Sequence, residues 1–189
     1  ETATGEGNAV FGDGAILGGN TGSANTGLAA QYNVNYNNTE LVLNALVQGN
    51  SSLTHAGAGT LILDQANTAA GALGITNAGA VVQLGTEDKA GQWAGTVLNG
   101  AGTLKIVNGA LTSAMTRAEG ATAAIVVDSA ASVNLGGTDG SMLKGITLAA
   151  GGRLANVSGD ITVGAGATET LNLTLGADNV NQDTAGTAI

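Results

Sequence analysis

The fold follows from one stretch, Gly57-Ala58-Gly59-Thr60-Leu61-Ile62-Leu63, and from its echo, Gly100-Ala101-Gly102-Thr103-Leu104-Lys105-Ile106. Each copy is a glycine-rich bend that runs directly into an apolar strand, and the second copy begins 43 residues after the first. Repetition of one bend-and-strand unit indicates that a structural unit is stacked along the chain. The pattern therefore predicts an elongated stack of layers, without one closed globular core.

The composition agrees with thin apolar layers. Only 2% of the 189 residues are aromatic, whereas 43% are hydrophobic, so Val, Leu, Ile and Ala have to supply the core. The 32 glycines and the absence of proline predict frequent tight bends. The hydrophobic content and the β-branched runs provide enough apolar surface to offset ordering entropy, which argues against a disordered low-complexity chain.

The charge excludes some partners. The formal net charge is −9 with five Lys and Arg residues, so nucleic acid and anionic membranes would be repelled. The chain has no cysteine, which excludes disulfides and thiolate metal sites. Residues 1–25 lack the basic-then-apolar layout of a signal peptide, so we expect a processed or excised piece of a longer protein.

Short apolar runs recur about every ten residues, separated by Gly, Asn, Thr and Ser. Strands of three to five residues are too short to bury a face alone, but stacked coils bury each strand against its neighbours. This rhythm predicts an all-β parallel β-solenoid. An alternative helix over Glu40 to Val47 stays open. The predicted strands are Tyr32–Tyr36, Leu41–Val47, Thr60–Leu63, Leu73–Ile75, Val81–Leu84, Gly95–Leu98, Thr103–Val107, Ala124–Val127, Ser132–Leu135, Gly145–Leu148, Gly152–Leu154, Ile161–Val163 and Leu171–Leu175.

Within these strands we expect five apolar side chains to face the interior and four glycines to form bends. The interior residues are Leu61, Leu63, Leu104, Ile106 and Leu173, and the bend glycines are Gly57, Gly59, Gly100 and Gly102. If the bend at Gly59 needs a positive φ, a β-branched residue there should destabilise the stack.

The run from Ala45 to Thr68 resembles the autotransporter-associated β-strand repeat, also called the passenger-associated transport repeat. The run from Gly71 to Gly85 resembles its continuation, and Asn8 to Ala15 resembles the phenylalanine-and-glycine stretch that often precedes it. The resemblance implies a right-handed parallel β-helix in the passenger of a type V secreted protein. Such a protein is anchored in the outer membrane of a Gram-negative bacterium by a β-barrel that lies outside this chain.

On this basis residues 1–189 are expected to form a single β-helix passenger fragment. It comprises N-terminal coils over 1–44, the best-matched repeats over 45–111, further coils over 112–177 and an irregular end over 178–189. At roughly 20 residues per coil, the chain would make about eight to ten coils.

The resemblance implies a surface role without chemistry. We expect a bacterial cell-surface or secreted protein that acts in adhesion or self-association, with a host or bacterial cell surface, or a second copy, as partner. A structural spacer or export-folding element is the first alternative, and a carbohydrate-active enzyme on the same scaffold is the second. We expect no catalytic residue, no cofactor and no metal.

Two single residues are candidate sites. His55 is the only histidine, so it could serve a catalytic triad only if the fold brought Ser and an acid to it, and the alternative is an exposed loop histidine. Trp93 is a weak candidate for stacking on a sugar ring, and the alternative is packing at the rim of the core.

Three short motifs are also candidates. Glu87-Asp88-Lys89 is the compact charged cluster, and a solvated loop accounts for it. Gly12-Asp13-Gly14 and Gly136-Gly137-Thr138-Asp139-Gly140 suggest calcium-binding turns, but type I′ or II′ turns account for them equally well. Asn and Thr at outward strand positions could form a ladder that binds polar partners or another copy of the chain.

Overall fold

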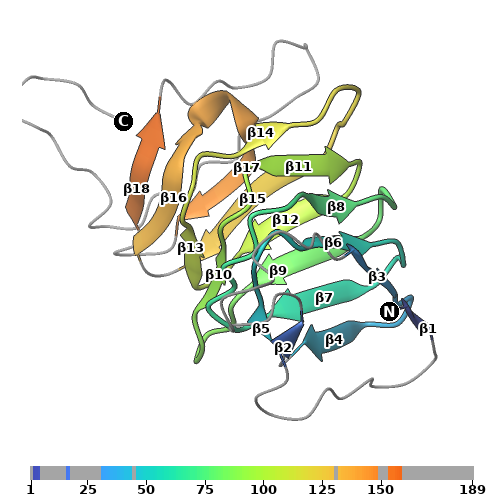
Figure 1. The fold of residues 1–189 in the computed structure, drawn as a ribbon. Coiled ribbons are helices and arrows are strands. Elements are labelled where there is room, and N and C mark those ends of the chain that lie inside the picture. Colours follow the sequence, from blue (N-terminus) through green and yellow to red (C-terminus); the bar gives the residue numbers. More distant parts are fainter. Residues whose placement is uncertain are drawn as a thin grey trace, which may run out of the picture.

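The computed structural model describes residues 2–4, 16–17, 31–43, 46–129, 132–148 and 153–158. These residues form a parallel β-solenoid of about five turns, with three stacked sheets. Successive coils follow the sequence colours from blue at the bottom of Figure 1 to orange at the top. All listed strand pairs are parallel, because each strand returns to the same sheet one coil later.

Sheet A contains six strands in the order β1-β3-β6-β8-β11-β14. Their bounds are β1 Thr2–Thr4, β3 Gln31–Asn35, β6 Ser52–His55, β8 Leu73–Ile75, β11 Val97–Gly100 and β14 Thr116–Arg117. From β3 onward the coils differ in length: Leu73 pairs with Leu98, 25 residues on, whereas Val97 pairs with Thr116, 19 residues on.

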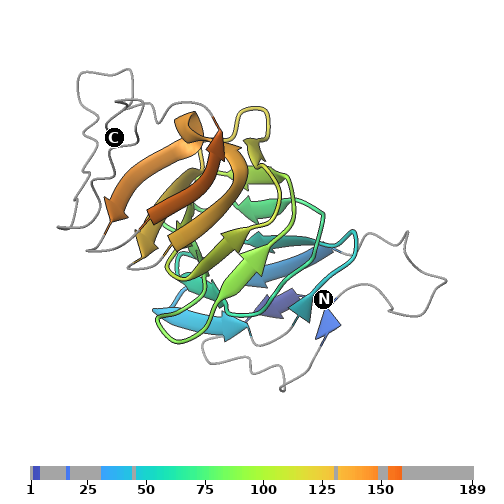
Figure 2. The ribbon, with the colours of Figure 1, turned by 90° about the vertical axis from the view of Figure 1, so that its left-hand side faces the viewer.

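Sheet B contains six strands in the order β17-β15-β12-β9-β7-β4. Their bounds are β4 Glu40–Leu43, β7 Thr60–Leu63, β9 Val81–Leu84, β12 Thr103–Ile106, β15 Ala124–Ser129 and β17 Leu143–Leu148. Five steps of about 4.8 Å make this sheet about 24 Å tall along the stack. Sheets A and B lie on different sides of the coil, as the turned view in Figure 2 shows.

Sheet C contains four strands, β10 Gly91–Trp93, β13 Gly109–Leu111, β16 Ser132–Asp139 and β18 Arg153–Ser158. A separate pair joins β2 Ile16–Leu17 to β5 Leu46–Val47, and the short 3₁₀ helix η1 Gly140–Met142 precedes β17. Among the described residues, no helix has the length and apolarity needed to cross a membrane.

The core lies between the three sheets and consists of vertical columns of apolar side chains. In sheet B, register places Leu61, Val82 and Leu104 directly above one another, and all three are fully buried. A second column contains Leu63, Leu84 and Ile106. The predicted inward positions Leu61, Leu63, Leu104 and Ile106 are thus confirmed, whereas Leu173 lies outside the described residues.

The predicted strand bounds agree most closely in the middle of the chain. Thr60–Leu63, Leu73–Ile75 and Val81–Leu84 match β7, β8 and β9 residue for residue. The apolar run Leu41–Val47 is divided between β4 and β5, so the helix alternative is wrong. The sequence did not predict β6, β10, β13 or β14, and the predicted strands beyond residue 158 lie outside the described residues.

One predicted strand is displaced. Gly95–Leu98 was expected, but β11 begins at Val97 and ends at Gly100. Gly95 lies in the corner before β11, where a Cβ atom would stand 2.0 Å from the Gly71 carbonyl oxygen. Gly100 ends the strand with a φ of +96°, a backbone conformation that favours glycine.

The coil count is compatible with the predicted repeat length. The described residues make about five turns, and the prediction of eight to ten coils includes residues that the structure does not describe. The right-handed sense expected from the resemblance stays a prediction.

Gly59 is required for a reason other than the one expected from sequence. Its φ is not among the positive values, so the bend does not depend on left-handed backbone. Instead, a Cβ atom on Gly59 would lie 2.0 Å from the Asn38 carbonyl oxygen of the previous coil. The bend needs glycine because two backbone segments approach too closely for any side chain.

We therefore expect Gly59→Ala to destabilise the solenoid by about 1–3 kcal/mol, because backbone has to move to admit the methyl group. The matched control is Gly79→Ala, since a Cβ atom there meets only the Asn77 Oδ1 atom, at 3.5 Å. Urea unfolding followed by circular dichroism measures both variants. Equal unfolding midpoints for the two would contradict this interpretation.

Candidate functional site

The outer face of sheet A is the candidate functional site. Alternate residues of a strand point to opposite sides of a sheet, so the burial of Leu53 and His55 places Ser52 and Thr54 on the outside. Register then aligns one outward column across four coils. This column, here called the amide column, consists of Asn33, Thr54, Gly74 and Asn99.

The amide column is accessible at its two ends and low in its middle. Asn33 and Asn99 are exposed, and Thr54 is half-buried. A Cβ atom on Gly74 would lie 2.8 Å from the Thr54 Oγ1 atom, so the threonine side chain lies over the glycine. The Asn99 Oδ1 atom accepts a hydrogen bond of 2.8 Å from the Gly100 backbone N–H, and this bond fixes one side of the amide.

A second outward column beside it is also uncharged. Gln31 pairs with Ser52, and Val97 pairs with Thr116. Gln31 and Thr116 are exposed, so hydroxyl and amide groups dominate this part of the face. Such groups both donate and accept hydrogen bonds.

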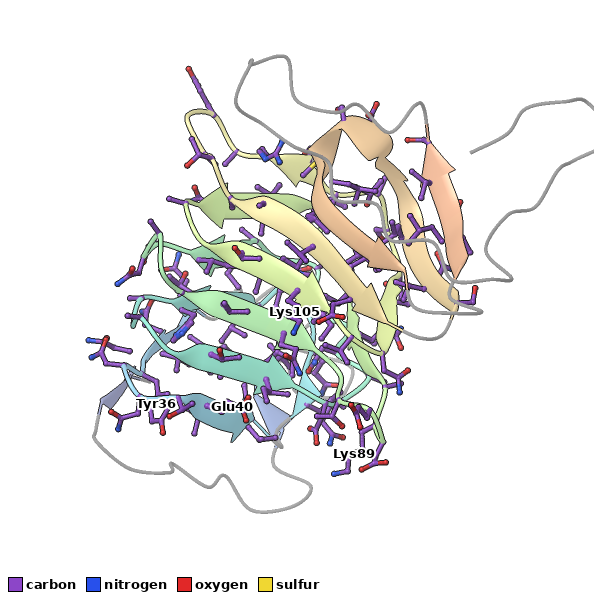
Figure 3. All side chains as sticks on the ribbon, turned by 180° about the vertical axis from the view of Figure 1, so that it is seen from behind. Tyr36, Glu40, Lys89 and Lys105 are labelled. Atoms are coloured by element: carbon purple, nitrogen blue, oxygen red, sulfur yellow. The ribbon has the colours of Figure 1, made fainter. Side chains whose placement is uncertain are left out.

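Charge is concentrated elsewhere on the described surface. Arg117 carries the charge within the described strands of sheet A, but it lies in the column of Leu98 and donates hydrogen bonds to the Ala123 and Met142 carbonyl oxygens. Glu40 and Lys105 belong to sheet B, and Lys89 lies at a corner of the coil (Figure 3). The outer face of sheet A is thus a neutral surface on a strongly acidic chain.

The structure places His55 in the core, so the expectation of an exposed loop residue is wrong. His55 is fully buried in β6, between Val34 of β3 and Ile75 of β8 in the register. Its Nε2 atom lies 2.8 Å from the Gly59 carbonyl oxygen, and its Nδ1 atom lies 3.3 Å from the Val34 carbonyl oxygen. The imidazole therefore ties the bend at Gly57–Gly59 to the strand before it.

His55→Leu is expected to destabilise the solenoid by about 1–3 kcal/mol, because the buried Gly59 carbonyl loses its side-chain donor. His55→Gln is the matched variant, since its amide retains a donor, and a smaller loss is expected. Thermal unfolding checks both. If Leu were tolerated as well as Gln, the hydrogen bond to Gly59 would carry no stability.

Trp93 is fully buried in β10 and belongs to the apolar core. Its Nε1 atom would lie 2.6 Å from a Cβ atom on Gly95, so the missing side chain at Gly95 makes room for the indole. The indole N–H has no hydrogen-bond partner among the described residues. The ring therefore has no exposed face on which a sugar could stack.

The charged cluster Glu87-Asp88-Lys89 lies in a side loop between β9 and β10. The loop closes on itself, because a Cβ atom on Gly91 would stand 2.3 Å from the Gly85 backbone nitrogen. Glu87 and Asp88 are exposed, as a solvated loop predicts. Lys89 differs, since its Nζ atom lies 3.2 Å from Oδ2 of Asp64, whose side chain is only 3% exposed.

The glycine-rich segment at Gly136–Gly140 is a strand irregularity and not a separate turn. Gly136 and Gly137 both have positive φ, +61° and +82°, and they lie within β16 where the register to β18 shifts. Thr138 is buried and accepts a hydrogen bond from the Met115 N–H through its Oγ1 atom. Asp139 caps η1 by accepting a hydrogen bond from the Ser141 N–H.

No group of three or more metal-ligating side chains occurs in the part of the chain that the structure describes. Gly12-Asp13-Gly14, the other suggested calcium turn, lies outside that part. The structure therefore offers no geometry on which a calcium site could be built at Asp139.

The hydrogen bonds from the Ser141 backbone and side chain lower the pKa of Asp139 from its ordinary value of 3.8. A lowered pKa means that the cap is intact above the ordinary value and is lost as the pH falls through the folded-state pKa. An NMR titration of the Asp139 carboxyl should give a value below 3.8. Ser141→Ala should move it only part of the way back, because the backbone donor remains, and a full return would show that the backbone bond is unimportant.

Comparison with known proteins identifies no relative: no family model, no curated protein and no solved structure matches this chain. The fold itself, a parallel β-solenoid, is compatible with autotransporter passengers. The functional argument therefore rests on the residues of the chain and on the geometry of its surface.

Sequence reasoning identified the class of group on the candidate face but not the face itself. Outward Asn and Thr were expected, yet Asn99 was not assigned to a column with Asn33. The missing information was the strand Ser52–His55, whose alternation of half-buried and buried residues defines which side of sheet A is outside. The signal was weak because His55 occupies an inward position that is ordinarily apolar.

Proposed function

We propose that this chain is a passenger fragment of a type V secreted protein and acts in self-association or adhesion at the bacterial surface. In this proposal it carries no catalytic residue, and its partner is a second copy or a cell surface. The parent protein would be anchored in the outer membrane of a Gram-negative bacterium by a β-barrel. Nucleic acid is excluded as a partner by the net charge of −9.

The observation that carries the proposal is the neutral outer face of sheet A. Exposed charges keep acidic chains apart, because like charges repel within about one Debye length, about 8 Å at physiological salt. The amide column lacks that barrier and presents exposed hydrogen-bonding groups at Asn33 and Asn99. A neutral, hydrogen-bonding face is suited to contact with another neutral polar surface.

Two further features support a passenger. The resemblance of Ala45 to Gly85 to passenger repeats falls on β5 through β9, in the regular part of the solenoid. The chain also lacks cysteine, which suits export across an outer membrane without premature disulfides.

A structural spacer is the alternative function, and one observation favours it. The inward columns of sheet B continue from Leu41 to Ile125 with every member buried, so the stack can act as a rod that holds other modules away from the membrane. A spacer would need no adhesive face.

Display on the bacterial surface distinguishes these functions. Cells that display the chain should settle faster, or bind host cells better, than cells that display an unrelated β-solenoid of equal length at equal surface density. Equal settling and equal host-cell binding would refute adhesion and self-association and would leave the spacer function.

A further inference from the structure

We propose that the outer face of sheet A is a self-complementary surface that pairs with the same face of a second copy about a two-fold axis. In the pair, Asn33 of each copy lies opposite Asn99 of the other. This inference rests on the proposed function and specifies its self-association branch.

The order of residues in the amide column carries the inference. Along the solenoid the column reads Asn33, Thr54, Gly74 and Asn99, with one residue in each successive coil. A two-fold axis between β6 and β8 reverses this order in the second copy. The reversal places an amide opposite an amide at both ends, and the threonine of each copy opposite the glycine of the other.

The chemistry of the paired residues is complementary. A carboxamide has a carbonyl acceptor and an NH₂ donor, so two facing amides can exchange two hydrogen bonds. The Asn99 Oδ1 atom already accepts from the Gly100 N–H, but a carbonyl oxygen has a second lone pair for the partner. At the centre, Gly74 adds no side chain above the sheet, so the half-buried Thr54 of the second copy finds space there.

The electrostatics favour this face over the others. In an isologous pair every residue meets its symmetry-related set, so an exposed carboxylate near the axis would approach its own copy. Glu40 of sheet B, Glu87 and Asp88 of the side loop, and Asp139 of sheet C are exposed. The exposed residues Asn33 and Asn99 carry no charge, so two copies approach here without that repulsion.

The size of the face predicts a weak individual contact. Five strands at about 4.8 Å and four residues at about 3.3 Å give roughly 250 Å² per copy, well below the ~800 Å² per partner of a stable complex. Many copies on one surface can raise the overall strength by about 10²–10⁴-fold through multivalency. The contact is therefore expected to act between crowded surfaces and not between dilute monomers.

The test uses beads coated with the purified chain at equal density, and it measures bead clumping by light scattering. Wild-type beads should clump with little dependence on salt. Asn33→Asp combined with Asn99→Asp places two carboxylates opposite each other, and clumping at low salt should fall roughly tenfold or more. The control combines Thr122→Asp with Asn134→Asp, which adds the same charge at exposed positions away from sheet A and should leave clumping unchanged.

A charge swap tests the two-fold register. Asn33→Asp combined with Asn99→Lys brings opposite charges together only if Asn33 faces Asn99, so clumping should return and become sensitive to salt. If the copies were related by translation, Asp would face Asp and Lys would face Lys, and clumping would stay low. Circular dichroism and thermal unfolding of each variant exclude misfolding as the cause.

The outcomes separate this inference from the proposed function. Clumping of wild-type beads that neither double variant alters would overturn the pairing face while self-association stands. Loss with Asp at both positions and no recovery in the charge swap would overturn the two-fold register. Wild-type beads that fail to clump would overturn self-association itself, together with this inference.

Discussion

The structure depends on hydrogen bonding between the backbones of successive coils at a spacing of about 4.8 Å. Because every strand lies directly above the strand one coil earlier, each side chain meets the same register position of its neighbour. Leu61, Val82 and Leu104 therefore pack as a column, and a polar side chain can enter such a column only if the backbone supplies a partner. His55 meets that condition through the Gly59 carbonyl oxygen.

The same spacing governs the corners and the outer surface. At the corners, backbone segments approach so closely that Gly59 and Gly95 have no room for a side chain. On the outside, the columns are free of the packing requirement, so their chemistry can differ from sheet to sheet. Sheet A presents amides and hydroxyls, whereas sheet B carries Glu40 and the ion pair between Lys105 and Asp128, whose Nζ and Oδ2 atoms are 2.8 Å apart. A repetitive interior thus allows chemically distinct faces.

Sequence patterning was sufficient for the fold because apolar alternation and glycine bends are local signals. It identified β7, β8 and β9 correctly, since each is a short apolar run bounded by Gly, Asn or Thr. It failed at β10 and β13, where Gly91 and Gly109 begin the strands and their pairing comes from the neighbouring coils. The candidate face could not be assembled from sequence because the coils differ in length, so Asn33, Thr54 and Asn99 share no constant spacing.

The side loop between Gly85 and Gly91 shows how such a chain can vary. Its two ends lie against each other, so the coil resumes its path at Gly91 close to where it left it at Gly85. The number of residues between these glycines therefore has little influence on the sheets, and loop-closure entropy grows only slowly with length. A longer segment, even a small folded module, could occupy this corner while the coils above and below keep their alignment. The perimeter of the solenoid is in this sense a place for insertion, and the stack can acquire new parts without changing its interior.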